Sequence, residues 1–238
     1  MKILSIDTSS KNCSISISEV VDNKFKIISS KNSDNEKTHS QKLMPLVQEM
    51  FSEANLTLDN IDLLACCVGP GSFTGIRIGV ATIKAFADVK NIPVVGVTSL
   101  ESLAYNISNN GFIIPIIDAK NNNAYSAVFL NNNFNYSINI DNIADNIENI
   151  LNIFLENLQN SEDDIYFVGD GSVIYKDLIL NKFKNYNYHF SDKNIQSSIS
   201  LAKCAYSKYI SGNYGDSNSI FPIYLKKSQA ERNLNGEK

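Results

Sequence analysis

Apolar and polar residues in the first part of the chain predict three strands followed by a helix. Strands are expected at Ile3–Asp7, Cys13–Ser18 and Phe25–Ser29, because each is a short apolar or alternating stretch. Apolar residues then recur at helical spacing over Gln41–Ala54, after a capping-box pattern that begins at Thr38. The three strands are expected to form an antiparallel meander that leads into this helix.

The stretch Val68–Gly79, with the sequence VGPGSFTGIRIG, predicts a tight turn from a strand into a long helix. Glycine tolerates the positive φ angles that such a turn requires, and Ser72 or Thr74 is expected to cap the helix. Backbone amides at a helix start can also bind an anion, so a phosphate site is an alternative. The spacing matches neither a dinucleotide fingerprint nor a Walker A loop. A structural turn is the simpler interpretation.

The helix after this loop, which ends near Val89, is apolar around more than half of its circumference. A helix on one face of a sheet needs an apolar arc of only about 100° or somewhat more. We expect Ile76, Val80, Ile83 and Ala87 to face the sheet. The remaining apolar positions would then be exposed in a monomer and available for a partner. These are Gly75, Ile78, Gly79, Thr82 and Phe86.

The order of elements then repeats, which indicates an internal duplication. Strand Ile61–Val68 precedes the glycine loop, and strand Pro93–Val97 and helix Ser99–Ile107 follow its helix. The second half supplies strands at Phe112–Asp118, Ala124–Leu130, Phe134–Ile140, Ile165–Val168 and Tyr186–Phe190, and helices at Asp141–Leu158, Gly171–Phe183 and Ser197–Ile210. We expect an α/β protein of two βββαβαβ-type lobes, the second reduced, facing each other across a cleft.

This order is the one found in the actin, hexokinase and Hsp70 ATPase superfamily, an actin-like ATPase (ribonuclease H-like) fold. We expect the first lobe at residues 1–107 and the second at 108–210, with residues 211–238 packing back on the first.

In that fold the first-strand turns of both lobes point at the phosphates of a nucleotide. Asp7 and Asp118 are therefore the candidate carboxylate pair for Mg²⁺ or for activating a nucleophile. The alternative is that each carboxylate closes an Asx turn, which we favour. Ser9 stands where phosphate-binding members have a glycine, which argues against a kinase. The candidate nucleotide cleft comprises Asp7, Thr8, Ser9, Asp118, Gly169 and Gly171.

Composition narrows the function further. The net charge of −4 argues against a chain that binds nucleic acid through its own field. The first residues, MKILSIDTSS, do not fit a signal peptide, and no apolar stretch is long enough for a membrane helix, so we expect a cytoplasmic protein. Cys13, Cys66, Cys67 and Cys204 form no CxxC pair and are expected to be reduced core thiols. We expect no metal site and no cofactor, and neither His39 nor His189 has a partner at metal spacing.

Six stretches spread over nearly the whole chain carry a resemblance to a known family. They are KILSIDTSSKNCSISI, THSQKLMPLV, VGPGSFTGIRIGVATIKAFA, GVTSLESLA, IIDAKNNNAY and FPIYLKK. In this order they resemble the TsaB (YeaZ) family of the bacterial tRNA threonylcarbamoyladenosine machinery. The resemblance implies a subunit needed to install threonylcarbamoyl on N6 of the adenosine beside the anticodon.

The resemblance also implies that chemistry lies in a partner. In this family a catalytic paralogue, TsaD, transfers the group from threonylcarbamoyl-AMP, and the ATPase TsaE joins the two. TsaD carries a His-x-x-x-His metal pair where this chain has Ser99 and Leu103. A leucine cannot bind a metal, and a neutral hydroxyl is a poor ligand for iron or zinc. This chain would then be a non-catalytic stabiliser of TsaD that meets tRNA only through the complex.

The family is understood to use two helices to bind TsaD and, when alone, a second copy of itself. We expect the partner surface to comprise residues of both helices: His39, Leu43, Leu46, Val47, Met50, Gly75, Ile78, Gly79, Thr82 and Phe86. The alternative function is an ATP-dependent phosphotransferase or ATPase that uses Asp7 and Asp118.

Overall fold

The computed structural model describes residues 1–33, 39–159 and 161–226, which form two compact units. The first unit contains Met1–Asn106 and Ile195–Ile223, and the second begins at Ile107 and ends at Asn194, with the chain returning to it at Tyr224. Each unit is built on one five-stranded sheet.

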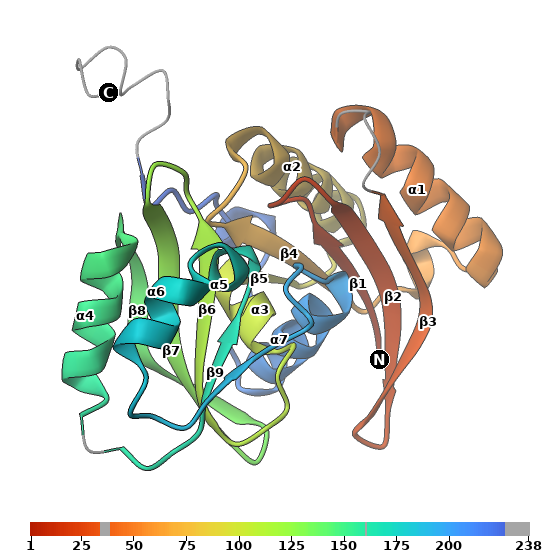
Figure 1. Cartoon of the computed structure of the whole chain (residues 1–238). Helices are drawn as coiled ribbons and strands as arrows, with labels where there is room; N and C mark the ends of the chain where they lie inside the picture. The colour runs from red at the N-terminus through yellow and green to blue at the C-terminus, as the bar shows by residue number, and fades with distance from the viewer. Residues whose placement is uncertain (34–38, 160, 227–238) are drawn as a thin grey trace. The chain divides into compact units, whose positions relative to one another are not determined.

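The first unit has a mixed sheet with the order β3-β2-β1-β4-β5 (Figure 1). Its strands are β1 (Lys2–Asp7), β2 (Cys13–Val21), β3 (Lys24–Ser33), β4 (Leu63–Gly69) and β5 (Val94–Thr98). The first three are antiparallel, whereas β4 and β5 run parallel to β1 and to each other. The predicted meander and its parallel extension are therefore confirmed.

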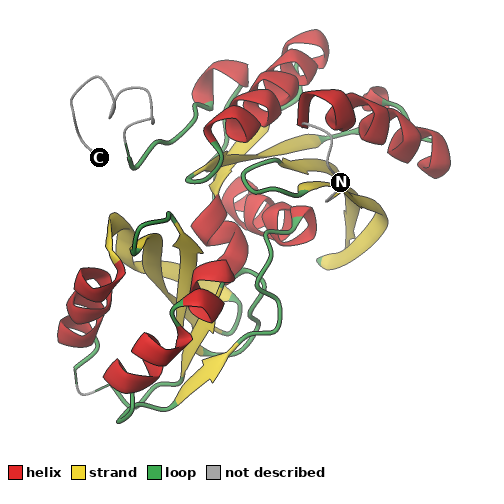
Figure 2. Ribbon diagram, turned by 45° about the horizontal axis from the view of Figure 1, so that its top comes forward, coloured by secondary structure: helices red, strands yellow, loops and turns green. Residues whose placement is uncertain are grey.

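Helices cover both faces of this sheet (Figure 2). On one face lie α1 (His39–Ala54) and α2 (Phe73–Lys90), and their apolar stripes form one core with Leu4, Ile6 and the inward residues of β2 and β4. On the other face α7 (Ser198–Ile210) packs against Ile3, Leu63 and their neighbours, and α3 (Ser99–Ala104) packs against α7, β4 and β5. Alternate residues of one strand thus serve two cores, as the pleat of a strand requires.

The second unit repeats this topology, with the order β10-β9-β6-β7-β8. Its strands are β6 (Gly111–Asp118), β7 (Asn123–Asn132), β8 (Asn135–Asn146), β9 (Ile165–Val168) and β10 (Tyr188–Phe190). Again three antiparallel strands are extended by two parallel ones. The prediction of an α/β fold with two duplicated lobes is confirmed.

The second unit has no helix as long as α1 or α2 among the residues that the structure describes. Its helices are α4 (Ile147–Asn157), α5 (Asp170–Ile174) and α6 (Lys176–Lys182). Where α2 has 18 residues, the corresponding segment is divided at Tyr175 into helices of five and seven. In this sense the second lobe is reduced.

One predicted helix start is wrong. We expected a helix from Asp141, but β8 continues to Asn146, and Ile143 pairs with Ser126 of β7. The helix begins only after Asn146, whose side chain accepts a hydrogen bond from the Glu148 amide. The alternation of isoleucine with polar residues in 138–146 fits a strand as well as a helix, and the neighbouring strand decided between them.

The predicted end of the second lobe is also wrong, because α7 packs in the first unit. Buried serines hold it there. Ser5 Oγ donates to the Ser198 carbonyl oxygen at 2.9 Å, and the Ser198 amide donates to Ser14 Oγ at 3.0 Å. The pattern of apolar residues does not predict this contact between α7 and the sheet, because serine is a polar residue.

The segment after α7 returns to the edge of the first sheet. Gly215 and Val94 exchange two backbone hydrogen bonds, of 2.8 and 3.0 Å. Ile220 is buried in the core beneath α1 and α2, and the Ile223 amide donates to the Val68 carbonyl oxygen at 2.7 Å. Two single turns of 3-10 helix, η1 (Leu58–Asn60) and η2 (Ser217–Ser219), complete the secondary structure that the described residues form.

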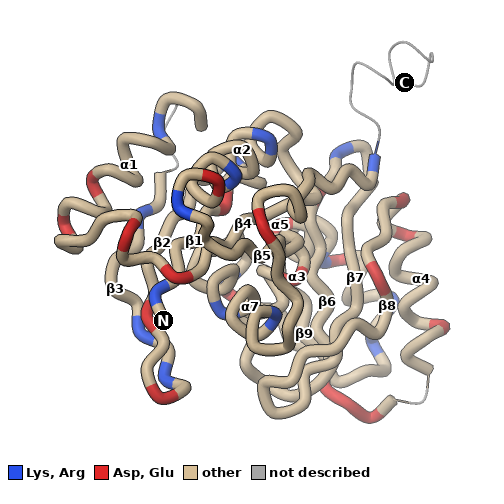
Figure 3. The backbone as a smooth tube through the Cα atoms, turned by 180° about the vertical axis from the view of Figure 1, so that it is seen from behind, with Lys and Arg blue, Asp and Glu red and all other residues tan. Residues whose placement is uncertain are grey.

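Acidic and basic residues are interspersed along the chain (Figure 3), in keeping with the small net charge. Among the helices of the described ranges, none is both long enough and apolar enough to cross a bilayer.

Candidate functional site

The first candidate site is the turn that follows β1, where Asp7 is almost completely buried. Asp7 Oδ1 accepts hydrogen bonds from the Ser9 amide at 2.9 Å and from the Ser9 hydroxyl at 2.6 Å. For Oδ2 no hydrogen-bond partner is found in the described part of the chain, and the Cys67 thiol is a further polar neighbour of the carboxyl group. Burial raises the pKa of Asp7, although the hydrogen bonds from Ser9 act in the opposite direction. The carboxyl group closes an Asx turn.

The glycine loop packs directly against this turn. The Ser72 amide donates to the Ser9 carbonyl oxygen at 2.7 Å, and a Cβ atom at Gly71 would overlap that oxygen. Ser72 is the N-cap of α2, and its hydroxyl accepts from the Gly75 amide at 3.2 Å. Of the two predicted capping residues, Ser72 is therefore the one that caps. Two amides that an anion could have used are bound within the chain, which favours the structural turn over the phosphate site.

The two helical glycines also face this turn, and this corrects the expectation that they lie exposed. Gly75 and Gly79 are buried. A Cβ at Gly75 would overlap the Thr8 carbonyl oxygen, and one at Gly79 would overlap Thr8 Oγ1. The Thr8 hydroxyl donates to the Gly75 carbonyl oxygen at 2.7 Å. Glycine is needed here for close approach within the first unit, so a substitution such as Gly79→Leu would disturb the fold itself.

The predicted partner surface needs a further correction on α1. Leu43, Val47 and Met50 are 0 to 3% exposed, because they pack on the same sheet as α2. Five of the ten predicted interface residues are therefore interior to the first unit. The other five are partly exposed: His39, Leu46, Ile78, Thr82 and Phe86. Met44, 49% exposed on α1, was missed. Met44 follows Leu43 of the apolar stripe directly in the sequence, and this neighbourhood could have identified it.

His39 starts α1 and joins it to the turn. Its Nε2 lies 2.8 Å from the Ser10 carbonyl oxygen, which requires that Nε2 carries the proton. The Nδ1 atom is buried, and no hydrogen-bond partner for it is found in the described part of the chain. His39 thus serves the packing of α1 rather than lying free at an interface.

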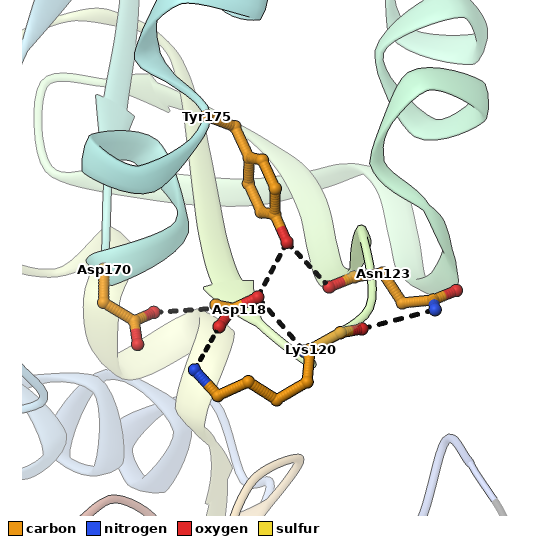
Figure 4. A network of polar contacts seen from close by, with 5 residues as sticks. All are labelled: Asp118, Lys120, Asn123, Asp170 and Tyr175. Carbon is orange, nitrogen blue, oxygen red and sulfur yellow. Dashed lines mark hydrogen bonds and ion pairs between the residues drawn. The ribbon is translucent and has the colours of Figure 1, made fainter.

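The second candidate site is the turn after β6, shown in Figure 4. Asp118 Oδ1 accepts from the Lys120 amide at 3.1 Å and from the Tyr175 hydroxyl at 2.7 Å, while Oδ2 pairs with Lys120 Nζ at 2.5 Å. The Asp118 amide donates to Asp170 Oδ1 at 3.1 Å. The Tyr175 hydroxyl also lies 3.3 Å from the Asn123 carbonyl oxygen. The network joins the β6 turn to α5.

The pKa values of the two carboxyl groups in this network, Asp118 and Asp170, are shifted in opposite directions. Burial raises the pKa of Asp118, but the hydrogen bonds from Lys120 and Tyr175 outweigh it and hold that pKa below its usual value. Burial raises the pKa of Asp170, which has fewer compensating donors. The pKa of Tyr175 is raised by burial and by its bond to Asp118. The hydrogen bonds therefore favour the ionised form of Asp118, whereas burial disfavours the ionised form of Asp170.

Asp7 and Asp118 occupy equivalent positions, one in each unit, and each accepts from the amide two residues later. The Asx turns that we favoured are therefore present in both. Their use as a pair remains a prediction. Gly169 has a φ of 102° and donates through its amide to Asn194 Oδ1, and Gly171 lets α5 approach Ile116 closely. These glycines repeat the roles of Gly69 and of the glycines in α2.

Ser99 and Leu103, which the resemblance aligns with the metal-binding histidines of TsaD, make other contacts here. Ser99 and Leu103 are both completely buried, and the Ser99 hydroxyl donates to the Pro70 carbonyl oxygen. His189 stacks on Tyr166, and its Nε2 lies 3.2 Å from Asp164 Oδ1. In the ranges that the structure describes, no three histidine, cysteine or acidic residues gather as a metal site would require.

The four cysteines are buried and unpaired. Burial raises the pKa of the Cys13 thiol to about 11, and it raises those of Cys66, Cys67 and Cys204 as well. A thiol with a raised pKa is a poor nucleophile and a poor metal ligand. The cysteines are core residues.

The chain is similar to known proteins over most of its length. A family model described as TsaD, tRNA N6-adenosine threonylcarbamoyltransferase, matches residues 26–234. A Haemophilus influenzae protein named tRNA threonylcarbamoyladenosine biosynthesis protein TsaB is 26% identical over 247 residues, covering 99% of this chain and 98% of that protein. A Bacillus subtilis protein of the same name is 29% identical over 180 residues, which is 75% of each.

The fold is also found in a solved structure. The solved structure of YeaZ from Pseudomonas aeruginosa superposes with a TM-score of 0.75 at 20% sequence identity. The match covers 94% of this chain and 99% of that one.

Proposed function

This chain belongs to the family described as tRNA N6-adenosine threonylcarbamoyltransferase (TsaD), and on this premise we propose that it is a subunit of the tRNA threonylcarbamoyladenosine machinery without chemistry of its own. Relatives that match over most of the chain carry the name TsaB, which supports a role in this modification. The proposed role is to bind and stabilise a catalytic paralogue of the TsaD type.

The observation that carries the non-catalytic part is the state of the β1 turn. An ATPase of this fold needs a carboxylate and backbone amides that reach a nucleotide. Here Asp7 is 1% exposed, and Ser9 and Ser72 hold the turn and the glycine loop against each other. General acid–base or metal-assisted catalysis requires a group within reach of the substrate. The geometry favours packing over chemistry at this position.

The residues at the positions of the TsaD metal pair support the same division of labour. Ser99 Oγ is engaged with the Pro70 carbonyl oxygen, and Leu103 is part of the buried interior. The Ser99 hydroxyl thus joins α3 to the glycine loop, and the Leu103 side chain is buried. We infer that transfer from threonylcarbamoyl-AMP occurs in the TsaD partner, with a TsaE-type ATPase joining the complex in the cytoplasm.

We place the partner surface on the outer sides of α1 and α2. Met44, Leu46, Ile78, Thr82 and Phe86 are apolar or weakly polar and remain partly or largely exposed. Exposed apolar residues on adjacent helices are suited to packing against another pair of helices. We propose that a TsaD-type partner covers them in the complex and that a second copy covers them when the chain is alone. tRNA is then reached through the complex, in keeping with the net charge of −4.

One observation favours a second candidate, an ATP-dependent phosphotransferase or ATPase. Asp118 and Asp170 lie at the β6 turn beside Lys120, whose side chain is 81% exposed. A carboxylate and a lysine at the end of a central strand could bind a nucleotide–magnesium complex. Both oxygens of the Asp118 carboxylate are, however, already engaged by Lys120 and Tyr175. We therefore rank this candidate second.

Reconstitution decides between the two. The chain is mixed with the TsaD and TsaE proteins of the same organism, tRNA, threonine, bicarbonate, ATP and the enzyme that forms threonylcarbamoyl-AMP, and modified adenosine is measured with and without the chain. We expect modification to require the chain. Titration of the isolated chain with Mg-ATP is the second arm. Micromolar binding with steady turnover would contradict the non-catalytic role, and modification that proceeds equally without the chain would contradict the role in the complex.

A further inference from the structure

The turn Asp7–Ser10 contacts both helices that carry the proposed partner surface. On the α2 side, the Thr8 hydroxyl donates to the Gly75 carbonyl oxygen at 2.7 Å, and the Ser72 amide donates to the Ser9 carbonyl oxygen at 2.7 Å. On the α1 side, His39 Nε2 lies 2.8 Å from the Ser10 carbonyl oxygen. One short turn therefore determines where the first turns of both helices lie on the sheet.

Within this turn, Thr8 makes the closest contact with α2. Its side chain is 1% exposed and lies between Gly75 and Gly79, one helical turn apart. Methyl groups at these glycines would overlap the Thr8 carbonyl oxygen and Thr8 Oγ1 respectively. The two glycines thus leave space for one threonine side chain. Its hydrogen bond fixes both the position of α2 along the helix axis and the distance of α2 from the sheet.

We propose that Thr8 is a positioning residue for partner binding, an inference that rests on the function proposed above. Thr8 holds α2 in the place at which Ile78, Thr82 and Phe86 match the partner. Helices pack with side-chain ridges in grooves, so a small displacement of one helix misaligns every contact along it. A surface already held in its binding arrangement also loses less free energy on association.

The chemistry of threonine makes the proposal testable with conservative variants. Thr8→Val keeps the shape of the side chain and removes the hydrogen-bond donor, whereas Thr8→Ser keeps the donor. We expect Thr8→Val to weaken binding of the TsaD partner by about tenfold or more and Thr8→Ser to retain most of the affinity. Affinity is measured by calorimetry on the full chain, and melting temperature is measured on the same samples.

Ser126→Ala is the matched control for stability. Ser126 Oγ is buried in the second unit and donates to the Pro115 carbonyl oxygen at 2.7 Å, the same kind of bond at the same length. We expect this variant to lose melting temperature as Thr8→Val does and to keep its affinity for the partner. Thr8→Val binding as tightly as Ser126→Ala would overturn the proposal.

A second pair of variants tests the contact between Thr8 and α2 from the helix side. These variants also provide a test if Thr8→Val does not fold. Gly79→Ala places a methyl group against Thr8 Oγ1, so it should displace α2 and weaken binding. In Thr8→Ala/Gly79→Ala that oxygen is absent, and the nearest atom of residue 8 is its Cβ, at 3.7 Å from the new methyl group. We expect the double variant to bind the partner more tightly than Gly79→Ala alone. Equal or weaker binding would overturn the proposal.

The parent chain separates this inference from the proposed function. If the parent does not bind the TsaD partner at all, the proposed function fails, and the positioning role of Thr8 fails with it. If the parent binds and the Thr8 variants bind equally well, only the positioning role fails.

Discussion

Ser14 and Ser198 are 184 residues apart in sequence and form two hydrogen bonds with each other in the core of the first unit. The Ser198 amide donates to Ser14 Oγ at 3.0 Å, and Ser14 Oγ donates to Ser198 Oγ at 2.9 Å. Ser5 adds a bond to the Ser198 carbonyl oxygen. The start of α7 is thereby attached to β1 and β2 through buried hydroxyl groups, which explains why this helix belongs to the first unit.

Replacing Ser14 with alanine should destabilise the first unit. The Ser198 amide would lose its acceptor in a buried position, and an unsatisfied buried polar group costs about 1–3 kcal/mol. The free energy of unfolding in urea measures the effect. Ser211→Ala is the control, because Ser211 Oγ makes an exposed bond to the Ser207 carbonyl oxygen at the end of the same helix. Equal stability of the two variants would show that the buried contact contributes little.

Replacing Asp7 or Asp118 with alanine should leave threonylcarbamoylation in the reconstituted complex largely intact. Both carboxylates close turns within their own units, so their loss should affect stability more than rate. Removal of a general acid or base typically lowers a rate by about 10²–10⁴-fold. A decrease of that size in either variant, with the circular dichroism spectrum unchanged, would assign that residue to catalysis and revive the ATPase candidate.

Replacing Tyr175 with phenylalanine should change how stability depends on pH. The hydroxyl helps to lower the pKa of Asp118 in the folded chain. A carboxyl with a lowered pKa stabilises the fold above its unfolded pKa of about 3.9, and this contribution is lost as the pH falls through the folded pKa. The stability gap between the parent and Tyr175→Phe should therefore be present at pH 7 and shrink as the pH falls below the unfolded pKa of about 3.9.

Tyr206→Phe is the control for that experiment. The Tyr206 hydroxyl donates to Asn23 Oδ1 at 3.2 Å, an amide oxygen that does not titrate. Urea unfolding at several pH values measures both gaps. A gap for Tyr175→Phe that stays constant with pH, as expected for Tyr206→Phe, would show that the hydroxyl does not act through the charge of Asp118.

Replacing Met44 with aspartate should weaken binding to the TsaD partner and self-association. Met44 is 49% exposed on α1, and a charge in an apolar interface remains without a partner. For a central contact the loss in affinity is expected to be tenfold or more, about 1–2 kcal/mol. Pull-down and sedimentation measure the two interactions. Ile138→Asp is the control, with a similarly exposed aliphatic residue on β8 of the second unit. Equal behaviour of the two variants would place the partner elsewhere.

Several features of the structure were predictable because they depend on neighbours in sequence. Apolar spacing identified most strands and helices, and the repeated order of elements identified the duplication. Ser72 as a helix cap and Asp7 as an Asx-turn residue follow from chemistry within three positions. The stripe Ile76, Val80, Ile83 and Ala87 is buried as expected, since a helical period of 3.6 residues alone places it on one side.

Other features depend on residues that are distant in sequence, and the tertiary structure alone decided them. From the sequence, the glycines of α2 predict a partner face, because glycine indicates only that some group approaches closely. The structure shows that the approaching residue is Thr8 of the same unit. The placement of α7 depends on serines that are polar by type and buried by context. The sequence by itself therefore determined the elements and their order, because periodicity and capping are local. The tertiary structure decided which surfaces meet, because close approach and buried hydroxyl pairing depend on both partners at once.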